Sequence, residues 1–171
     1  IVNDSKLEGK ILYLEKNSST VTGTAPTGTI TASGVAVAAE TITIGNVVYT
    51  WRASITSASP ANEVKIGAAA TNSLDNLKDA INGTSSVGAP GSEYSQKTVR
   101  HPHVTAGAKD ATTLVVASTN TNTSGSLATT ETMTNWAWGA STLSAGTLGA
   151  IAQNTKTSDG PAGISGDRNY I

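Results

Sequence analysis

Residues 41–51 read Thr-Ile-Thr-Ile-Gly-Asn-Val-Val-Tyr-Thr-Trp, and this stretch decides the fold class. Polar and apolar residues alternate over 41–44, which is typical of a strand with one buried face. Gly45 and Asn46 form a two-residue turn signal, because both tolerate the positive φ angles of a primed hairpin turn. Strand-forming residues resume over 47–51, so the stretch predicts a β-hairpin.

The residues after the hairpin predict one more strand and then a helix. Residues 63–66 form a short alternating run, Glu-Val-Lys-Ile. Over residues 70–82 the period changes, since Leu74, Leu77 and Ile81 recur at helical spacing with polar residues between them. This segment predicts one amphipathic helix.

Both ends of that helix carry a sequence signal. Thr71 or Asn72 can cap its start through a side-chain oxygen, and Gly83 can end it in the left-handed conformation. Both signals agree with the helical period, so we expect a helix over about residues 70–82 that Gly83 ends.

Two or three strands follow. Residues 97–104 form a candidate strand interrupted by Pro102, and residues 112–117 form a clearer one. Trp136 and Trp138 lie two residues apart, so they share one side if that segment is extended. This order of elements predicts an α+β fold: a β-rich antiparallel sheet or sandwich with one amphipathic helix packed on it. A single sheet is favoured, and an immunoglobulin-like sandwich is the alternative.

The chain divides by composition into three parts. We expect an N-terminal arm and Ser/Thr/Gly linker over residues 1–34, a β-rich globular domain over 35–148, and an extended tail over 149–171. Within the arm, residues 10–15 read Lys-Ile-Leu-Tyr-Leu-Glu. This apolar run is either a strand of the domain or a strand that docks on a neighbouring subunit.

Composition excludes several kinds of partner and chemistry. Of the 171 residues, 13% are charged and the net charge is −1, so neither nucleic acid nor a membrane surface is expected as a partner. Cysteine is absent, which rules out disulfides, thiolate zinc sites and a cysteine nucleophile. The chain starts without Met and without a signal-peptide pattern, and we expect it to be processed or to be a piece of a longer protein.

The histidines are the only candidate metal ligands of note. His101-Pro102-His103 could bind a metal ion with an oxygen from Glu93 or Asp110. Two imidazoles do not complete a tetrahedral site, so a loop leading into a strand is the favoured interpretation.

Signatures of catalysis are missing. The sequence contains no Gly-x-Ser-x-Gly elbow, no phosphate-binding glycine loop and no paired carboxylates suited to glycoside cleavage. We therefore predict that the protein is not an enzyme, and that it has no catalytic, cofactor-binding or metal-binding residues and no cofactor.

The aromatic residues allow two interpretations. Tyr49, Trp51, Trp136 and Trp138 could form a platform on which sugars stack, but with no Phe in the chain we expect them to fill the core. Glycosylation triplets occur by chance in so Ser/Thr-rich a chain, and we assign them no role; they begin at Asn3, Asn17, Asn82 and Asn122.

The C-terminal segment contains three Gly-x-y triplets over residues 160–168. That repeat lets three chains wind about one axis, but three triplets are too few for a stable triple helix. A glycine-rich tail is the favoured interpretation, and a trimeric fibre stem is the alternative.

The middle of the chain resembles a β-rich domain of structural proteins in tailed-bacteriophage virions. The resemblance lies in the hydrophobic pattern and turn glycines of residues 41–51, 62–67, 69–83, 112–118 and 136–146. It implies a head-decoration, tail or fibre protein located in the virion, with no catalytic residues. The partners that it implies are other virion structural proteins such as capsid or tail proteins.

The chain is also expected to form a homo-oligomer, for which a trimer is one arrangement suited to a fibre. The alternative function is an extracellular carbohydrate-binding adhesin or surface-layer module, for which a host glycan would be the partner. Its basis is the Thr/Asn-rich loops together with Trp136 and Trp138.

Overall fold

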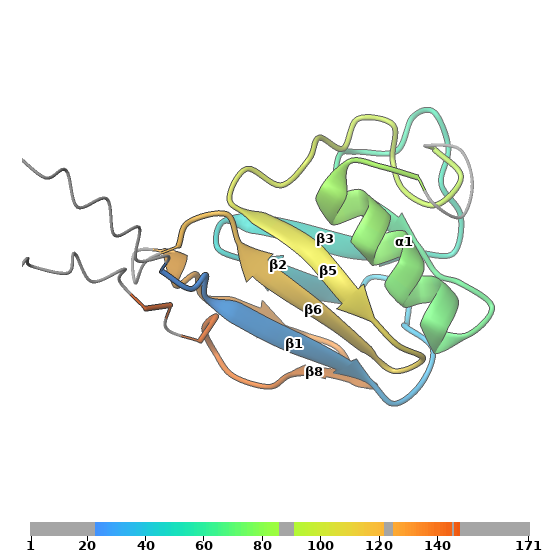
Figure 1. The fold of residues 1–171 in the computed structure, drawn as a ribbon. Coiled ribbons are helices and arrows are strands. Elements are labelled where there is room, and N and C mark those ends of the chain that lie inside the picture. Colours follow the sequence, from blue (N-terminus) through green and yellow to red (C-terminus); the bar gives the residue numbers. More distant parts are fainter. Residues whose placement is uncertain (1–22, 86–90, 122–124, 145, 148–171) are drawn as a thin grey trace, which may run out of the picture. The chain divides into compact units, whose positions relative to one another are not determined.

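Eight strands and one helix make up the described part of the chain (Figure 1). The computed structural model describes residues 23–85, 91–121, 125–144 and 146–147, which belong to one unit spanning Thr22–Ala150. The elements in chain order are β1 (Thr27–Ala32), β2 (Thr41–Ile44), β3 (Val47–Arg52), β4 (Glu63–Lys65), α1 (Ala70–Asn82), β5 (Val104–Lys109), β6 (Thr113–Ser118), β7 (Thr129–Glu131) and β8 (Trp136–Trp138).

The strands form two four-stranded sheets. The first sheet has the order β5-β6-β1-β8 and is antiparallel throughout. The second sheet has the order β4-β3-β2-β7 and is antiparallel except for the parallel pair β3 and β4. The predicted class, β-rich with one helix, is confirmed, and its sandwich form is the one found.

The core lies between the inner faces of the two sheets. Inward and outward residues alternate along β1, β2 and β6, as expected for strands with one buried face. The rings of Trp51 and Trp136 meet edge to face across the core, with centroids 5.0 Å apart. The largest fully buried side chains are Trp51, Tyr49, Ile30, Ile42, Ile44, Leu74, Leu77, Ile81, Leu114, Leu143, Val64 and Val104.

The predicted hairpin is confirmed as β2 and β3, which pair Ile44 with Val47 across the two-residue turn. Only Gly45 of the turn pair has a positive φ, +58°, so the expectation of two positive angles is wrong for Asn46. A glycine is needed at the first turn position alone, which is the requirement of a type II′ turn.

The helix matches its predicted range, but its start differs from the prediction. Gly83 ends it with φ +64°, and its backbone N–H donates to the carbonyl of Asp79. The N-cap is Ala69, without a side-chain bond, and the predicted caps Thr71 and Asn72 lie inside the first turn. Residues 66–69 connect β4 to the helix, and Ala69 has the extended backbone of an N-cap, with φ −138° and ψ 167°.

Two expectations about strands are wrong. The prediction of an arm and linker over residues 1–34 is wrong at its end, because β1 occupies residues 27–32 and lies between β6 and β8 in the first sheet. The strand expected over 97–104 begins only at Val104 and continues to Lys109. Pro102 lacks the N–H that a ladder requires, so pairing starts beyond it.

Helix α1 and nearby polar groups cover one side of the sandwich. Figure 1 shows α1 beside β5, at the opposite end of the first sheet from β8. At the free edge of β5, the side-chain amide of Asn82 donates to the Ala106 carbonyl (2.8 Å) and accepts from its N–H (2.9 Å). This amide takes the place of a neighbouring strand and protects the edge from other pairing.

The outer edge of β4 is also paired. The N–H of Lys65 donates to the carbonyl of Glu93 (2.7 Å), and the N–H of Ser95 donates to the carbonyl of Glu63 (2.9 Å). Because β4 and β5 are both covered, the remaining sheet edges are those of β7 and β8.

Candidate functional site

His101 is a buried structural residue with both ring nitrogens engaged. Its Nδ1 accepts a hydrogen bond from the backbone N–H of His103 (3.1 Å), which leaves Nε2 to donate to the carbonyl of Ile44 (3.2 Å). Only 3% of the residue is exposed, and its ring stacks near that of Tyr49. These bonds define a neutral tautomer that joins the His-Pro-His loop to the β2–β3 hairpin.

The structure does not bring the candidate metal ligands together. Glu93 pairs along β4 through its backbone, and Asp110 lies in the β5–β6 turn, where its Oδ1 accepts from the N–H of Thr113 (2.6 Å). Within the described ranges, no group of three or more His, Cys, Asp or Glu could hold a metal ion. Both nitrogens of His101 would have to give up hydrogen bonds before either could bind one.

Acid is expected to destabilise the fold through His101. Burial lowers the pKa of this imidazole from its ordinary value of 6.5, an effect that its bond to Ile44 only partly offsets. Below pH 6.5 the unfolded chain therefore binds this proton more readily than the folded chain, and the free energy of unfolding falls as pH decreases. Urea denaturation between pH 7 and pH 5 measures this slope.

The His101→Gln and His103→Gln variants separate the two histidines in that experiment. The first should flatten the slope. The second should keep most of it, because burial lowers the pKa of His101 more than the charge of the exposed His103 does. An unchanged slope in His101→Gln would assign the acid effect to other groups.

Glu40 acts at lower pH than His101. Hydrogen bonds from Thr134 and Val37 lower the pKa of its carboxyl from the ordinary value of 4.5, despite the opposing effect of burial. The stability that this carboxylate contributes is therefore lost only when the pH falls below 4.5.

Three of the four candidate aromatic residues belong to the core. Tyr49 and Trp51 are fully buried, and Trp136 is 3% exposed with its indole N–H donating to the carbonyl of Gly34 (2.8 Å). Burial raises the pKa of the Tyr49 hydroxyl above its usual range. The packing interpretation is confirmed for these three, whereas Trp138 is half-buried and lines a surface groove together with Glu131.

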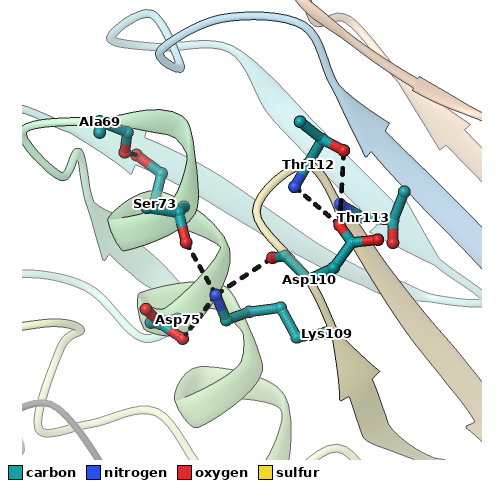
Figure 2. Close-up of polar contacts among 8 residues, drawn as sticks. Ala69, Ser73, Asp75, Lys109, Asp110, Thr112 and Thr113 are labelled. Carbon is teal, nitrogen blue, oxygen red and sulfur yellow. Dashed lines mark hydrogen bonds and ion pairs between the residues drawn. The ribbon is translucent and has the colours of Figure 1, made fainter.

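Lys109 joins the β5–β6 hairpin to helix α1 (Figure 2). Its Nζ donates to the Thr71 hydroxyl (2.9 Å) and to the Asp110 carbonyl (3.2 Å), and it forms an ion pair with Asp75 (3.1 Å). All three N–H donors of the ammonium group are thus engaged. These contacts fix the helix against the hairpin, and they leave the Lys109 ammonium group without a free N–H donor.

Among the described residues, β7 and β8 are the two edge strands that no segment covers along their whole length, and they lie at one corner of the sandwich. Their sheets are joined near the start of β7, where the N–H of Thr129 donates to the carbonyl of Ser141 (2.9 Å). Beyond this point the edges separate around a groove of about 360 Å³. Its walls comprise Thr129, Thr130, Glu131, Trp138, Ala140 and Ser141.

Backbone groups along both edges of the groove face away from their own sheets. The N–H of Gly139 bonds to Thr29 and that of Ser33 to Asn135, so the intervening Trp136 and Trp138 direct their N–H and C=O groups away from β1. On β7 the same alternation turns Glu131 away from β2. Within the described ranges, the backbone groups of these three residues have no partner.

The groove had no recognisable signal in the sequence. The sequence marks Trp138 only through its aromatic ring and gives no signal for Glu131 or for the backbone of the two edges. Strands β7 and β8 have three residues each, which is too short for a period to appear.

Comparisons with protein-family models, curated proteins and solved structures gave no match to this chain. Among the described residues, no helix is long and apolar enough to cross a membrane. The two sheets and α1 define the class of the fold, which is a β-sandwich closed on one side by a helix and, in the described residues, open at the β7–β8 corner.

Proposed function

We propose that this chain is a structural component of a tailed-phage virion, a head-decoration, tail or fibre protein that acts through protein–protein assembly. The resemblance of residues 41–51 and 69–83 to such domains supports this function. The main structural support is the way in which the two ends of the folded domain are joined.

Thr24 and Thr147 hold the two ends of the domain together. The N–H of Thr24 donates to the carbonyl of Thr147 (3.2 Å), the N–H of Thr147 donates to the Thr24 hydroxyl (3.0 Å), and the two hydroxyls are 2.8 Å apart. The described domain therefore begins and ends at neighbouring residues. A domain whose two ends lie together can be attached to a larger particle at one point, and it can then pack against neighbours without distortion of its own fold.

The outer face of the first sheet also suits assembly. Residues that point away from the core carry no charge on either central strand: they are Thr27, Thr29 and Thr31 on β1 and Thr113, Val115 and Ala117 on β6. A neighbour can cover uncharged residues of this kind, which are exposed or half-exposed, at little desolvation cost.

Purified particles test the proposed function. Particles from a culture that expresses this chain should retain it through density-gradient centrifugation, in a fixed ratio to the major capsid protein by mass spectrometry. An unrelated soluble protein from the same culture is the control and should be lost. Particles that contain none of the chain would refute the virion function.

A carbohydrate-binding module is the second candidate, favoured by the half-buried Trp138 in a groove that also holds Glu131 and threonine hydroxyls. If the protein is such a module, the unmodified chain should bind on a glycan array. Trp138→Ala should abolish this binding and retain the circular dichroism spectrum. Val48→Ala, on the exposed face of the second sheet, is the matched control and should bind normally. Absence of binding to any glycan would count against this candidate.

A further inference from the structure

We propose that the groove between β7 and β8 receives residues 10–15 of a second copy of this chain as an added strand. The inference deepens the assembly part of the proposed function and rests on it. The outward backbone groups of Trp136 and Trp138 form a short sheet edge that has no partner in the described ranges. An extended peptide pairs with such an edge through main-chain hydrogen bonds.

The geometry of the edge fits a strand better than a compact ligand. The open groups recur at every second residue of β8, as they do in any antiparallel ladder that lacks its next strand. Glu131 on the facing edge of β7 offers a further N–H and C=O to the same groove. A strand inserted at this corner would therefore meet backbone partners from both sheets.

Residues 10–15 have the composition that this position requires. The run Ile-Leu-Tyr-Leu has apolar side chains on both faces of an extended segment, so one face can cover the half-buried Trp138 while the other packs outside. Lys10 at its start complements the carboxylate of Glu131 in the groove. Six residues extend for about 20 Å, which exceeds the length of the three-residue edge.

Chain length favours a second copy over the same chain. Trp136 pairs with Ala32, eight residues beyond Thr24, so the far end of β8 lies about 26 Å from the start of the domain. An antiparallel strand from the same chain would have to return over this distance through residues 16–23, which can do so only when fully extended, because eight residues span at most about 26–29 Å. A neighbouring copy has no such limit.

Cysteine cross-linking tests this inference directly, because the full-length chain contains no cysteine of its own. Ala137→Cys places a thiol on the exposed side of β8. Four arm variants, Ile11→Cys, Leu12→Cys, Tyr13→Cys and Leu14→Cys, are each mixed with it under mild oxidation. In a docked strand, alternate residues face the same way. The cysteines at either 11 and 13 or 12 and 14 should therefore form the disulfide-linked heterodimer, with a yield more than about tenfold above that of the other pair.

Val48→Cys, exposed on the second sheet, replaces Ala137→Cys in the control and should give no alternating pattern. Equal yields at all four arm positions, or none, would overturn the inference. A link that forms only within one chain carrying both cysteines would also overturn it, since the donor would then not be a second copy. Cross-linking in solution is independent of particle content, so failure here and failure of the virion function are distinguishable.

Discussion

Replacing Trp51 by alanine should lower the free energy of unfolding by about 3–5 kcal/mol. Trp51 is fully buried and packs edge to face on Trp136, with ring centroids 5.0 Å apart. Alanine removes this contact and leaves a cavity between the two sheets. Urea denaturation monitored by circular dichroism measures the loss.

Two phenylalanine variants form a matched pair for that measurement. The indole N–H of Trp51 is buried without a hydrogen-bond partner, whereas that of Trp136 donates to the carbonyl of Gly34 (2.8 Å). Trp136→Phe should therefore cost about 1 kcal/mol more than Trp51→Phe, because it leaves the Gly34 carbonyl without its donor. A loss below about 1 kcal/mol for Trp51→Ala would contradict a core centred on this pair.

Replacing Gly67 by alanine should be the second large effect, costing about 1–3 kcal/mol. A Cβ at this position would collide with the side chain of Asn72 and lie 2.7 Å from the backbone nitrogen of Ser73, both in the first turn of α1. The Gly67 N–H also donates to the Ser73 hydroxyl (2.9 Å), so a shift of the helix would break this bond. Thermal and urea denaturation measure the change.

Gly107→Ala is the matched control for Gly67→Ala. Gly107 is exposed on β5, and an added Cβ would have its nearest neighbour, the carbonyl of Val115, at 4.0 Å. The control should change stability by less than about 1 kcal/mol and can raise it, since alanine restricts the unfolded chain. Equal losses in both variants would contradict the close approach of α1 to the end of β4.

The elements that local sequence predicts are those with a clear period or turn signal. The β2–β3 hairpin follows from alternation around Gly45, and the range of α1 follows from leucine spacing ended by Gly83. Strand β1 was missed because Thr-Gly-Thr-Ile-Thr-Ala is rich in residues also found in linkers. It becomes a strand through β6 and β8, which lie more than 80 residues later in the chain.

The candidate site could not be predicted for the same reason. The groove exists only because β7 and β8 end two different sheets at one corner, which is a property of topology. Similarly, the sequence marks Asn82 as the end of the helix and the start of a chance glycosylation triplet, but it gives no signal that the Asn82 amide closes the edge of β5 by pairing with Ala106. Residues 10–15 and the Gly-x-y triplets over 160–168 lie outside the described residues.

The solution mass of the full-length chain, measured by light scattering over a range of concentrations, tests the claim of assembly most directly. The comparison is a variant with Leu12→Asp and Leu14→Asp, which places two charges in the proposed donor strand and leaves the described domain unchanged. We predict an oligomer for the unmodified chain and a monomer for the variant. A monomer at every concentration for the unmodified chain, or the same oligomer for both, would contradict assembly through this arm.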